Sequence, residues 1–123
     1  MHQPGSLMTV NLQGTALPAG ATVAIHIDIT AQANITPFVA RQKVTQLVVT
    51  EISSQLRGET PDLNVGERLC WSVPVVLTSP ARGVVGRVGE VLVDAVTGEV
   101  LADTENLRRI GDNAERLAQR SPL

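Results

Sequence analysis

The stretch that decides the fold reads LCWSVPVVL (69–77), SPARG (79–83) and GRVGEVLVDAV (86–96). Apolar and β-branched residues alternate along the first segment, which is typical of a strand with one buried face. Its predicted core face holds Leu69, Trp71, Val73, Val75 and Leu77. The two apolar segments are close in sequence, so we expect them to pair as an antiparallel hairpin. Pro74 has no N–H group, which predicts an edge position or a bulge there.

Upstream of the hairpin, Thr36 and Pro37 predict the start of a long helix. Threonine caps free backbone amides, and proline suits the first helical position. The predicted helix runs from 37 to about 56, with Gly58 as a left-handed stop. Its apolar positions recur at intervals of three and four residues, at Val44, Leu47, Val48, Ile52 and Leu56. The stretch 58–68 is predicted to be a turn-rich loop.

Further elements are predicted toward both ends of the chain. The segment ATVAIHIDI (21–29) alternates with period two, which predicts a half-buried strand. Its apolar face holds Val23, Ile25, Ile27 and Ile29. A shorter strand is predicted at 8–13, after a flexible tail at 1–7. A C-terminal helix is predicted over 104–120.

These elements predict a single α+β domain over residues 8–123. The expected architecture is an antiparallel sheet packed against the long helix, with the C-terminal helix added. The chain has 123 residues, a length typical of one domain. Cystatin-like folds share this layout, as an analogy of architecture that carries no function with it.

The sequence argues against a nucleic-acid partner and against a membrane partner. Aromatic residues make up 2% of the chain, and its formal net charge is -2. Nucleic-acid surfaces combine stacking aromatics with positive charge, so a nucleic-acid partner is not expected. We expect no signal peptide, because the first residues lack a basic region followed by an apolar one, and no apolar run approaches the roughly 20 residues that cross a bilayer. We therefore expect a cytoplasmic protein with no membrane partner.

The segment GRVGEV (86–91) leads into VDAVTGEVL (93–101). Together with the strand before it, this pattern resembles the PepSY family over residues 69–101. The resemblance implies a small module that inhibits or regulates another protein, and it carries over no catalytic residue. Within the motif, Asp94 is expected to accept hydrogen bonds from turn amides, and Gly98 to supply a positive φ.

Two patterns that suggest chemistry have simpler explanations. Cys70 is the only cysteine, so no internal disulfide is expected, and it lacks the partners of a zinc site or a catalytic thiol. The glycines of GVVGRVG (83–89) imitate a phosphate-binding loop. They lead into a strand rather than opening a helix, so no helix N-terminus is present to hold a phosphate.

Titratable side chains on the predicted strands do not form a reactive cluster. His26 and Asp28 share one face but lack further ligands for a metal ion. Glu90 and Asp94 lie roughly 13 Å apart along one strand, which is too far for paired acid–base chemistry. No catalytic residue, cofactor or metal site is therefore predicted.

The C-terminal helix carries Arg108, Arg109 and Arg116, which form a candidate interaction surface. The leading hypothesis is a non-enzymatic protein-binding or regulatory module. Its partner is another protein, or a second copy in a homodimer. One alternative is an antidote-like partner of a protein from a neighbouring gene. The other is a small-ligand or enzymatic cystatin-like domain. Its functional residues would be His26, Asp28 and Glu90.

Overall fold

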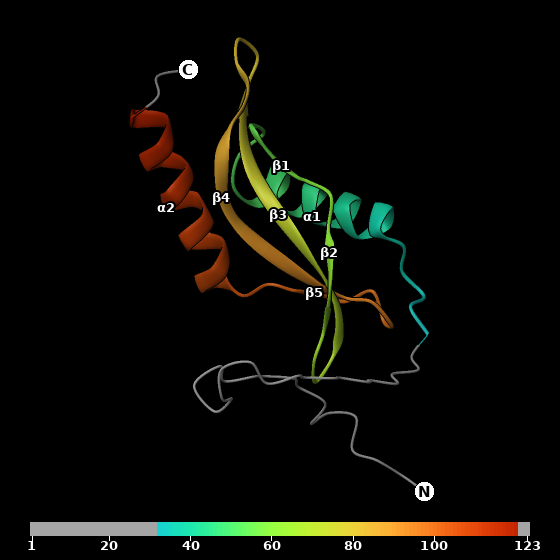
Figure 1. Cartoon of the computed structure of the whole chain (residues 1–123). Helices are drawn as coiled ribbons and strands as arrows, with labels where there is room; N and C mark the ends of the chain where they lie inside the picture. Colours follow the sequence, from blue (N-terminus) through green and yellow to red (C-terminus); the bar gives the residue numbers. More distant parts are fainter. Residues whose placement is uncertain (1–31, 121–123) are drawn as a thin grey trace, which may run out of the picture.

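The structure is a computed structural model and describes residues 32–120 (Figure 1). Its elements, in chain order, are α1 (Pro37–Glu51), β1 (Leu56–Gly58), β2 (Asp62–Val65), β3 (Leu69–Ser79), β4 (Gly83–Asp94), β5 (Val100–Leu101) and α2 (Thr104–Arg120). The antiparallel sheet with two helices confirms the predicted α+β class. The tail at 1–7 and the strands predicted at 8–13 and 21–29 lie outside the described residues.

The long hairpin of β3 and β4 is the centre of the sheet. β1 and β2 both pair with β3 on the side away from β4, and β5 pairs with the end of β4. Pro74 therefore lies inside the sheet, opposite Glu90, and the predicted edge position is wrong. Its missing N–H breaks no ladder, because Pro74 falls between the segments paired with β1 and β2. A bulge follows directly, between Val75 and Val76.

Helix α1 begins at the predicted position and ends earlier than predicted. Thr36 Oγ1 accepts a hydrogen bond from the Val39 N–H (3.2 Å), and Pro37 occupies the first turn. The helix ends at Glu51, so the prediction of an end near 56 is wrong. Leu56 is buried in β1 instead, and its apolar character therefore reflects the sheet core rather than a longer helix.

The predicted loop at 58–68 contains a strand, and the predicted left-handed stop at Gly58 is also wrong. Among the described residues, positive φ angles occur at Gly83 and Gly98. Gly58 belongs to β1, where a Cβ would lie 2.9 Å from Val73 Cγ1. The small size of Gly58 therefore lets neighbouring chain segments pack closely. The middle of the predicted loop is occupied by strand β2.

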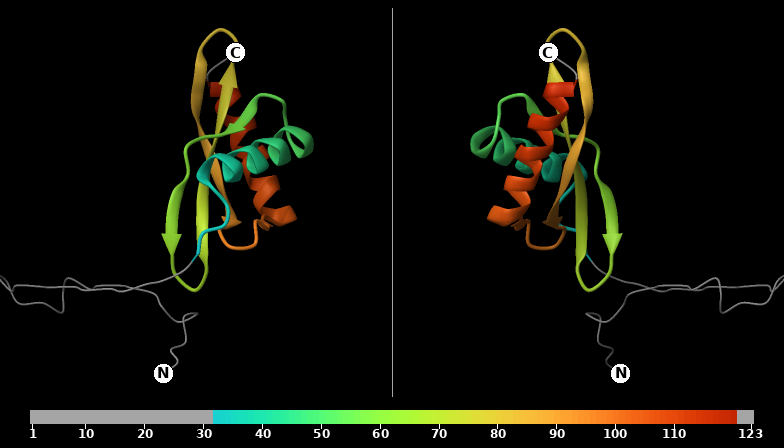
Figure 2. Two further views of the ribbon diagram at one scale, coloured as in Figure 1. Left: turned by 90° about the vertical axis from the view of Figure 1, so that its right-hand side faces the viewer. Right: turned by 90° about the vertical axis from the view of Figure 1, so that its left-hand side faces the viewer.

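Both helices lie on the same side of the sheet (Figure 2). Their buried side chains join one core with those of the strands, including Ala40, Val44, Val48, Val73, Val75, Val91, Val93 and Ile110. Two glycines of β4 let α2 approach. A Cβ on Gly89 would lie 2.7 Å from Ile110 Cγ1, and one on Gly86 would lie 2.8 Å from Leu117 Cδ2. Gly86 and Gly89 therefore allow α2 to pack closely against β4.

The turn after β4 is held by one carboxylate. Asp94 Oδ1 accepts hydrogen bonds from the N–H groups of Val96 and Thr97, each at 2.8 Å. Gly98 has a φ of 83°, and its N–H donates to the Asp94 carbonyl at 2.8 Å. The pKa of the Asp94 carboxyl is held below its ordinary value. The hydrogen bond from the Thr97 N–H is the largest cause, and the hydrogen bond from the Val96 N–H adds to it.

The same turn anchors the chain that enters α1. The Ala95 carbonyl accepts hydrogen bonds from the N–H groups of Asn34 (2.8 Å) and Ile35 (3.0 Å). The Trp71 indole N–H in turn donates to the Ile35 carbonyl at 2.6 Å. The entry to α1 is thereby fixed to both β3 and β4.

Candidate functional site

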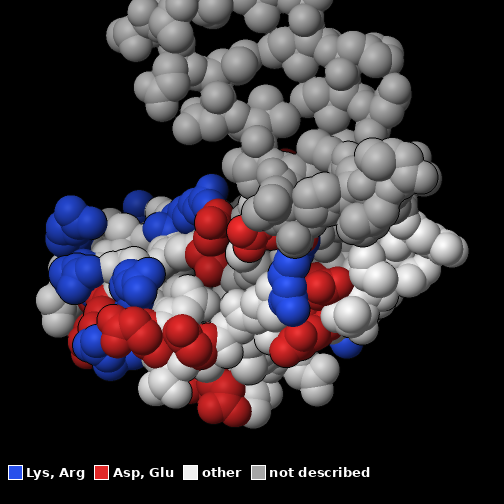
Figure 3. All heavy atoms as spheres, turned by 90° about the horizontal axis from the view of Figure 1, so that it is seen from below, with Lys and Arg blue, Asp and Glu red and all other residues white. Residues whose placement is uncertain are grey.

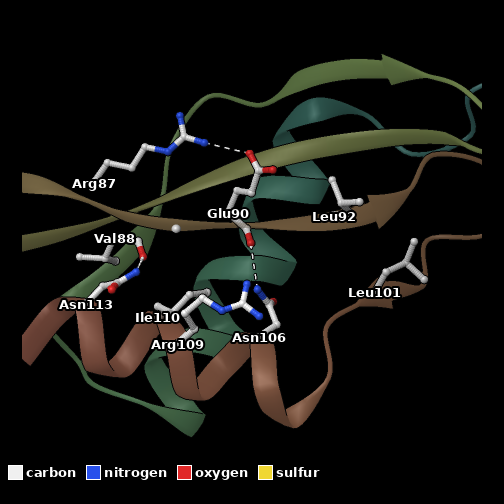
Figure 4. Close-up of a pocket in the computed structure, with 10 residues that line it drawn as sticks. Arg87, Val88, Glu90, Leu92, Leu101, Asn106, Arg109, Ile110 and Asn113 are labelled. Carbon is white, nitrogen blue, oxygen red and sulfur yellow. Dashed lines mark hydrogen bonds and ion pairs between the residues drawn. The ribbon is translucent and has the colours of Figure 1, made fainter.

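A groove lies between the outer edge of β4 and the N-terminal half of α2 (Figure 4). We call it the β4–α2 groove. It has a volume of about 500 Å³. Leu92 and Leu101 line its apolar part, where β5 ends. Its polar lining comes from β4 and α2 and includes Arg87, Glu90, Asn106, Arg109 and Asn113.

Two asparagines of α2 contact the edge carbonyls of β4. Asn113 Nδ2 donates to the Val88 carbonyl at 2.9 Å. Asn106 Nδ2 reaches the Glu90 carbonyl at 3.5 Å, the outer limit of a hydrogen bond (Figure 4). Asn106 Oδ1 is buried and has no hydrogen-bond partner within the described residues. The carboxamide of Asn106 is therefore incompletely satisfied, which is uncommon for a buried polar group.

Three charged side chains line the groove, and two of them pair with each other. Arg87 and Glu90 form an ion pair at 2.8 Å, and Ser72 Oγ donates to the same carboxylate at 3.0 Å. Arg109 extends from α2 over the groove (Figure 4), and it has no ion pair with another residue in the range 32–120. Arg109 is therefore the guanidinium of the groove that can pair with an anionic group of a ligand, as far as residues 32–120 show.

The predicted arginine surface divides in two. Arg108 pairs with Glu105 (2.5 Å) and Asp112 (3.7 Å) on its own helix, and Glu105 raises the pKa of its guanidinium. Arg116 is hydrogen-bonded to Asn113. Basic and acidic side chains accordingly mix on the α2 side of the molecule, the left of Figure 3. Of the three predicted arginines, Arg109 alone lines the groove.

No family model, no curated protein and no solved structure matches the chain. The geometry of its own side chains is therefore the basis for an assignment. Among residues 32–120, no group of three or more His, Cys, Asp or Glu side chains is placed to hold a metal ion. In the same range, no helix is both long and apolar enough to cross a membrane.

A second hollow, lined by β2, the β2–β3 turn and residues of β3, β4 and β5, adjoins the groove. It has a volume of about 560 Å³ and shares Leu92 and Leu101 with the β4–α2 groove. Cys70 also lines it and is 5% exposed. Burial, followed by the charge of Asp94, raises the pKa of the Cys70 thiol, although Arg68 opposes this shift. The sulfur is thus held as a thiol, which is a poor nucleophile.

We expect Cys70 to react with an aromatic disulfide reagent at pH 8 at least ~100-fold more slowly in the folded protein than in urea. Low exposure and a raised pKa both reduce the amount of accessible thiolate. Absorbance of the released thiolate gives the rate. Reaction of the folded protein at the rate measured in urea contradicts this assignment.

The other predicted residues are dispersed. His26 and Asp28 lie outside the described residues. Glu90 is engaged by Arg87 and Ser72, and Asp94 belongs to the turn after β4. The structure therefore brings Glu90 together with Arg109 in the groove, and it does not assemble Glu90 with Asp94 as an acid–base pair.

Asn106 and Asn113 were not predicted from the sequence. They lie seven residues apart on α2, which is close to two helical turns and places both on one face. That face meets Val88 and Glu90, two residues apart on β4. The seven-residue spacing of the two asparagines is visible in the sequence. Its role can be recognised only when the position of β4 beside α2 is known.

Proposed function

We propose that this chain is a non-enzymatic protein-binding module whose β4–α2 groove binds an extended acidic segment of a partner protein. The observation that carries the proposal is the Arg109 guanidinium, which lines the groove and has no ion pair among residues 32–120. A ligand that places an anionic group beside Arg109 supplies the partner that this guanidinium lacks.

An acidic peptide suits this lining. Each peptide unit carries one N–H donor and one carbonyl acceptor, which can pair with polar side chains along the groove. An acidic side chain on the same peptide can form a two-pronged hydrogen bond with Arg109. Leu92 and Leu101 offer an apolar wall for a neighbouring side chain of the peptide.

We place the chain with PepSY-like modules in a cystatin-like layout, in which a helix covers an antiparallel sheet. The support is the packing of α1 residues such as Val44 and Val48 in the sheet core, together with the turn formed by Asp94 and Gly98. Binding and regulation of another protein is the role that this resemblance implies.

The test uses a fluorescent peptide of alternating glutamate and valine, about eight residues long, and measures its polarisation. We expect Arg109→Gln to weaken binding about fivefold to tenfold, because the charge-assisted contact with the acidic side chain of the peptide is lost. Arg108→Gln is the matched control. Arg108 lies on the same helix but pairs with Glu105 and Asp112, so its replacement should leave the affinity unchanged.

A second control exchanges glutamate for lysine in the peptide. The lysine peptide should bind more weakly than the glutamate peptide, and the difference should shrink as salt is added. Equal binding of the two peptides, or equal affinity of the wild-type and Arg109→Gln proteins, contradicts the assignment of the groove.

A further inference from the structure

The outer edge of β2 is open. All four of its residues are exposed, and the apolar side chains of Leu63 and Val65 are 45% and 47% exposed. An exposed apolar edge strand is a template for pairing with another strand, and proteins generally cover or charge such edges.

The register shows which backbone groups the open edge presents. Pro74 directs its carbonyl to the β1–β2 side of β3, where it accepts from the Glu59 N–H at 2.8 Å. Backbone groups alternate in direction along a strand, so Ser72 and Cys70 face β2 as well. Their partners Asp62 and Asn64 therefore use their backbone groups toward β3. The N–H and C=O groups of Leu63 and Val65 point outward.

The edges of β1 and β4 differ from this one, because helix side chains are hydrogen-bonded to some of their backbone groups. At the β1 edge, the Gly58 N–H donates to Thr45 Oγ1 (2.9 Å), and Arg41 Nε donates to the Gly58 carbonyl (2.9 Å). At the β4 edge, Asn113 and Asn106 of α2 contact the edge carbonyls. β5 has two residues. Within residues 32–120, no side chain is hydrogen-bonded to the backbone of β2.

We propose that residues 21–29 of the same chain add to the free edge of β2 as a further strand. The segment ATVAIHIDI alternates with period two over nine residues, which is the pattern of a half-buried strand. A strand of this kind needs a sheet edge, because its backbone groups must be paired. Among residues 32–120, the edge of β2 is longer than two residues and has no side chain hydrogen-bonded to its backbone, unlike the edges of β1 and β4.

Chain length permits this pairing. The Ile35 carbonyl accepts the Trp71 indole N–H, and Trp71 is the register partner of Leu63, so the described chain begins close to this part of the sheet. An additional strand beside β2 lies about 10 Å from β3, which is two strand spacings. The connecting residues 30–33 span up to about 14 Å when extended.

The two faces of the added strand match their surroundings. Leu63 and Val65 extend the apolar row that contains Trp71, because directly paired residues share a face. Placed on that face, Ile25 and Ile27 cover the exposed parts of Leu63 and Val65. His26 and Asp28 then point to the opposite face, where a polar side chain can remain hydrated.

Amide hydrogen exchange of the full chain, read by NMR, tests this pairing. The N–H groups of Leu63 and Val65 should exchange at least ~10-fold more slowly than unstructured amides. Ile27→Pro removes a ladder donor and an apolar side chain, so it should abolish this protection and leave the amides of the β3–β4 hairpin protected. Ala16→Pro, in the turn-rich stretch 14–21, is the matched control and should leave Leu63 and Val65 protected.

Two outcomes overturn the proposal. The first is exchange of the Leu63 and Val65 amides at unstructured rates in the wild-type chain. The second is protection that appears only as a dimer forms across about a hundredfold range of protein concentration, because the strand then comes from a second copy. Protection in the monomer that Ile27→Pro removes is the result that supports it.

Discussion

Gly89→Ala is expected to lower the free energy of unfolding by about 1–3 kcal/mol. A Cβ at this position lies 2.7 Å from Ile110 Cγ1 and 3.4 Å from Ile110 Cδ1. The Ile110 side chain is 1% exposed and is surrounded by the core, so it cannot move aside without displacing its neighbours. Urea unfolding monitored by the fluorescence of Trp71 gives the free energy.

Two further glycines provide graded controls. A Cβ on Gly86 meets the terminal Cδ2 methyl of the half-buried Leu117, which can rotate away, so Gly86→Ala should cost less than Gly89→Ala. A Cβ on Gly66 meets nothing within 4 Å, and Gly66→Ala should be neutral or slightly stabilising. Ile110→Ala should itself cost about 2–5 kcal/mol, and in that background Gly89→Ala should become less costly. Equal effects at all three glycines contradict the proposed packing of α2.

Asp94→Ala is expected to destabilise the fold by about 2 kcal/mol at neutral pH. The substitution removes the acceptor of the Val96 and Thr97 N–H groups and also the partner of Arg68, which lies 3.7 Å away. The exposed Arg68 contributes little, so the turn hydrogen bonds account for most of the effect. A loss below about 0.5 kcal/mol shows that the turn does not depend on this carboxylate.

The pH dependence of the Asp94 contribution follows from its lowered pKa. The folded protein binds the Asp94 proton less readily than the unfolded chain does. The stabilisation is therefore complete above the unfolded pKa of about 4, and it is lost as the pH falls through the lower folded value. The difference in unfolding free energy between wild type and Asp94→Asn should be constant above about pH 5 and shrink below pH 4. A difference that does not change with pH contradicts this assignment.

Sequence patterns are sufficient for the longer elements of this fold. β3 extends from Leu69 as predicted, and α2 covers the predicted range 104–120. Both depend on regular periodicity over many residues, which is the most informative local signal. β1 and β2 were missed because they have three and four residues, and because Leu56 continues the apolar spacing of α1.

The site depends on contacts that no local pattern contains. The glycines at 83–89 imitate a phosphate-binding loop in the sequence, whereas Gly86 and Gly89 make room for Leu117 and Ile110 of α2 in the structure. Arg109 was predicted as part of a surface with Arg108 and Arg116. Helix geometry separates the three, because Arg108 finds acidic partners one turn away on the same helix, whereas Arg109 lies over the groove.

The most direct test of the binding groove is an NMR titration of the isotope-labelled protein with the glutamate–valine peptide. The proposed function predicts saturable shifts of the Asn106 side-chain amide, the Arg109 guanidinium and the backbone amides near Glu90. These shifts should be absent with the lysine–valine peptide. Shifts confined to other surfaces, or no shift at Asn106 and Arg109 at saturation, would show that the β4–α2 groove does not bind this class of ligand.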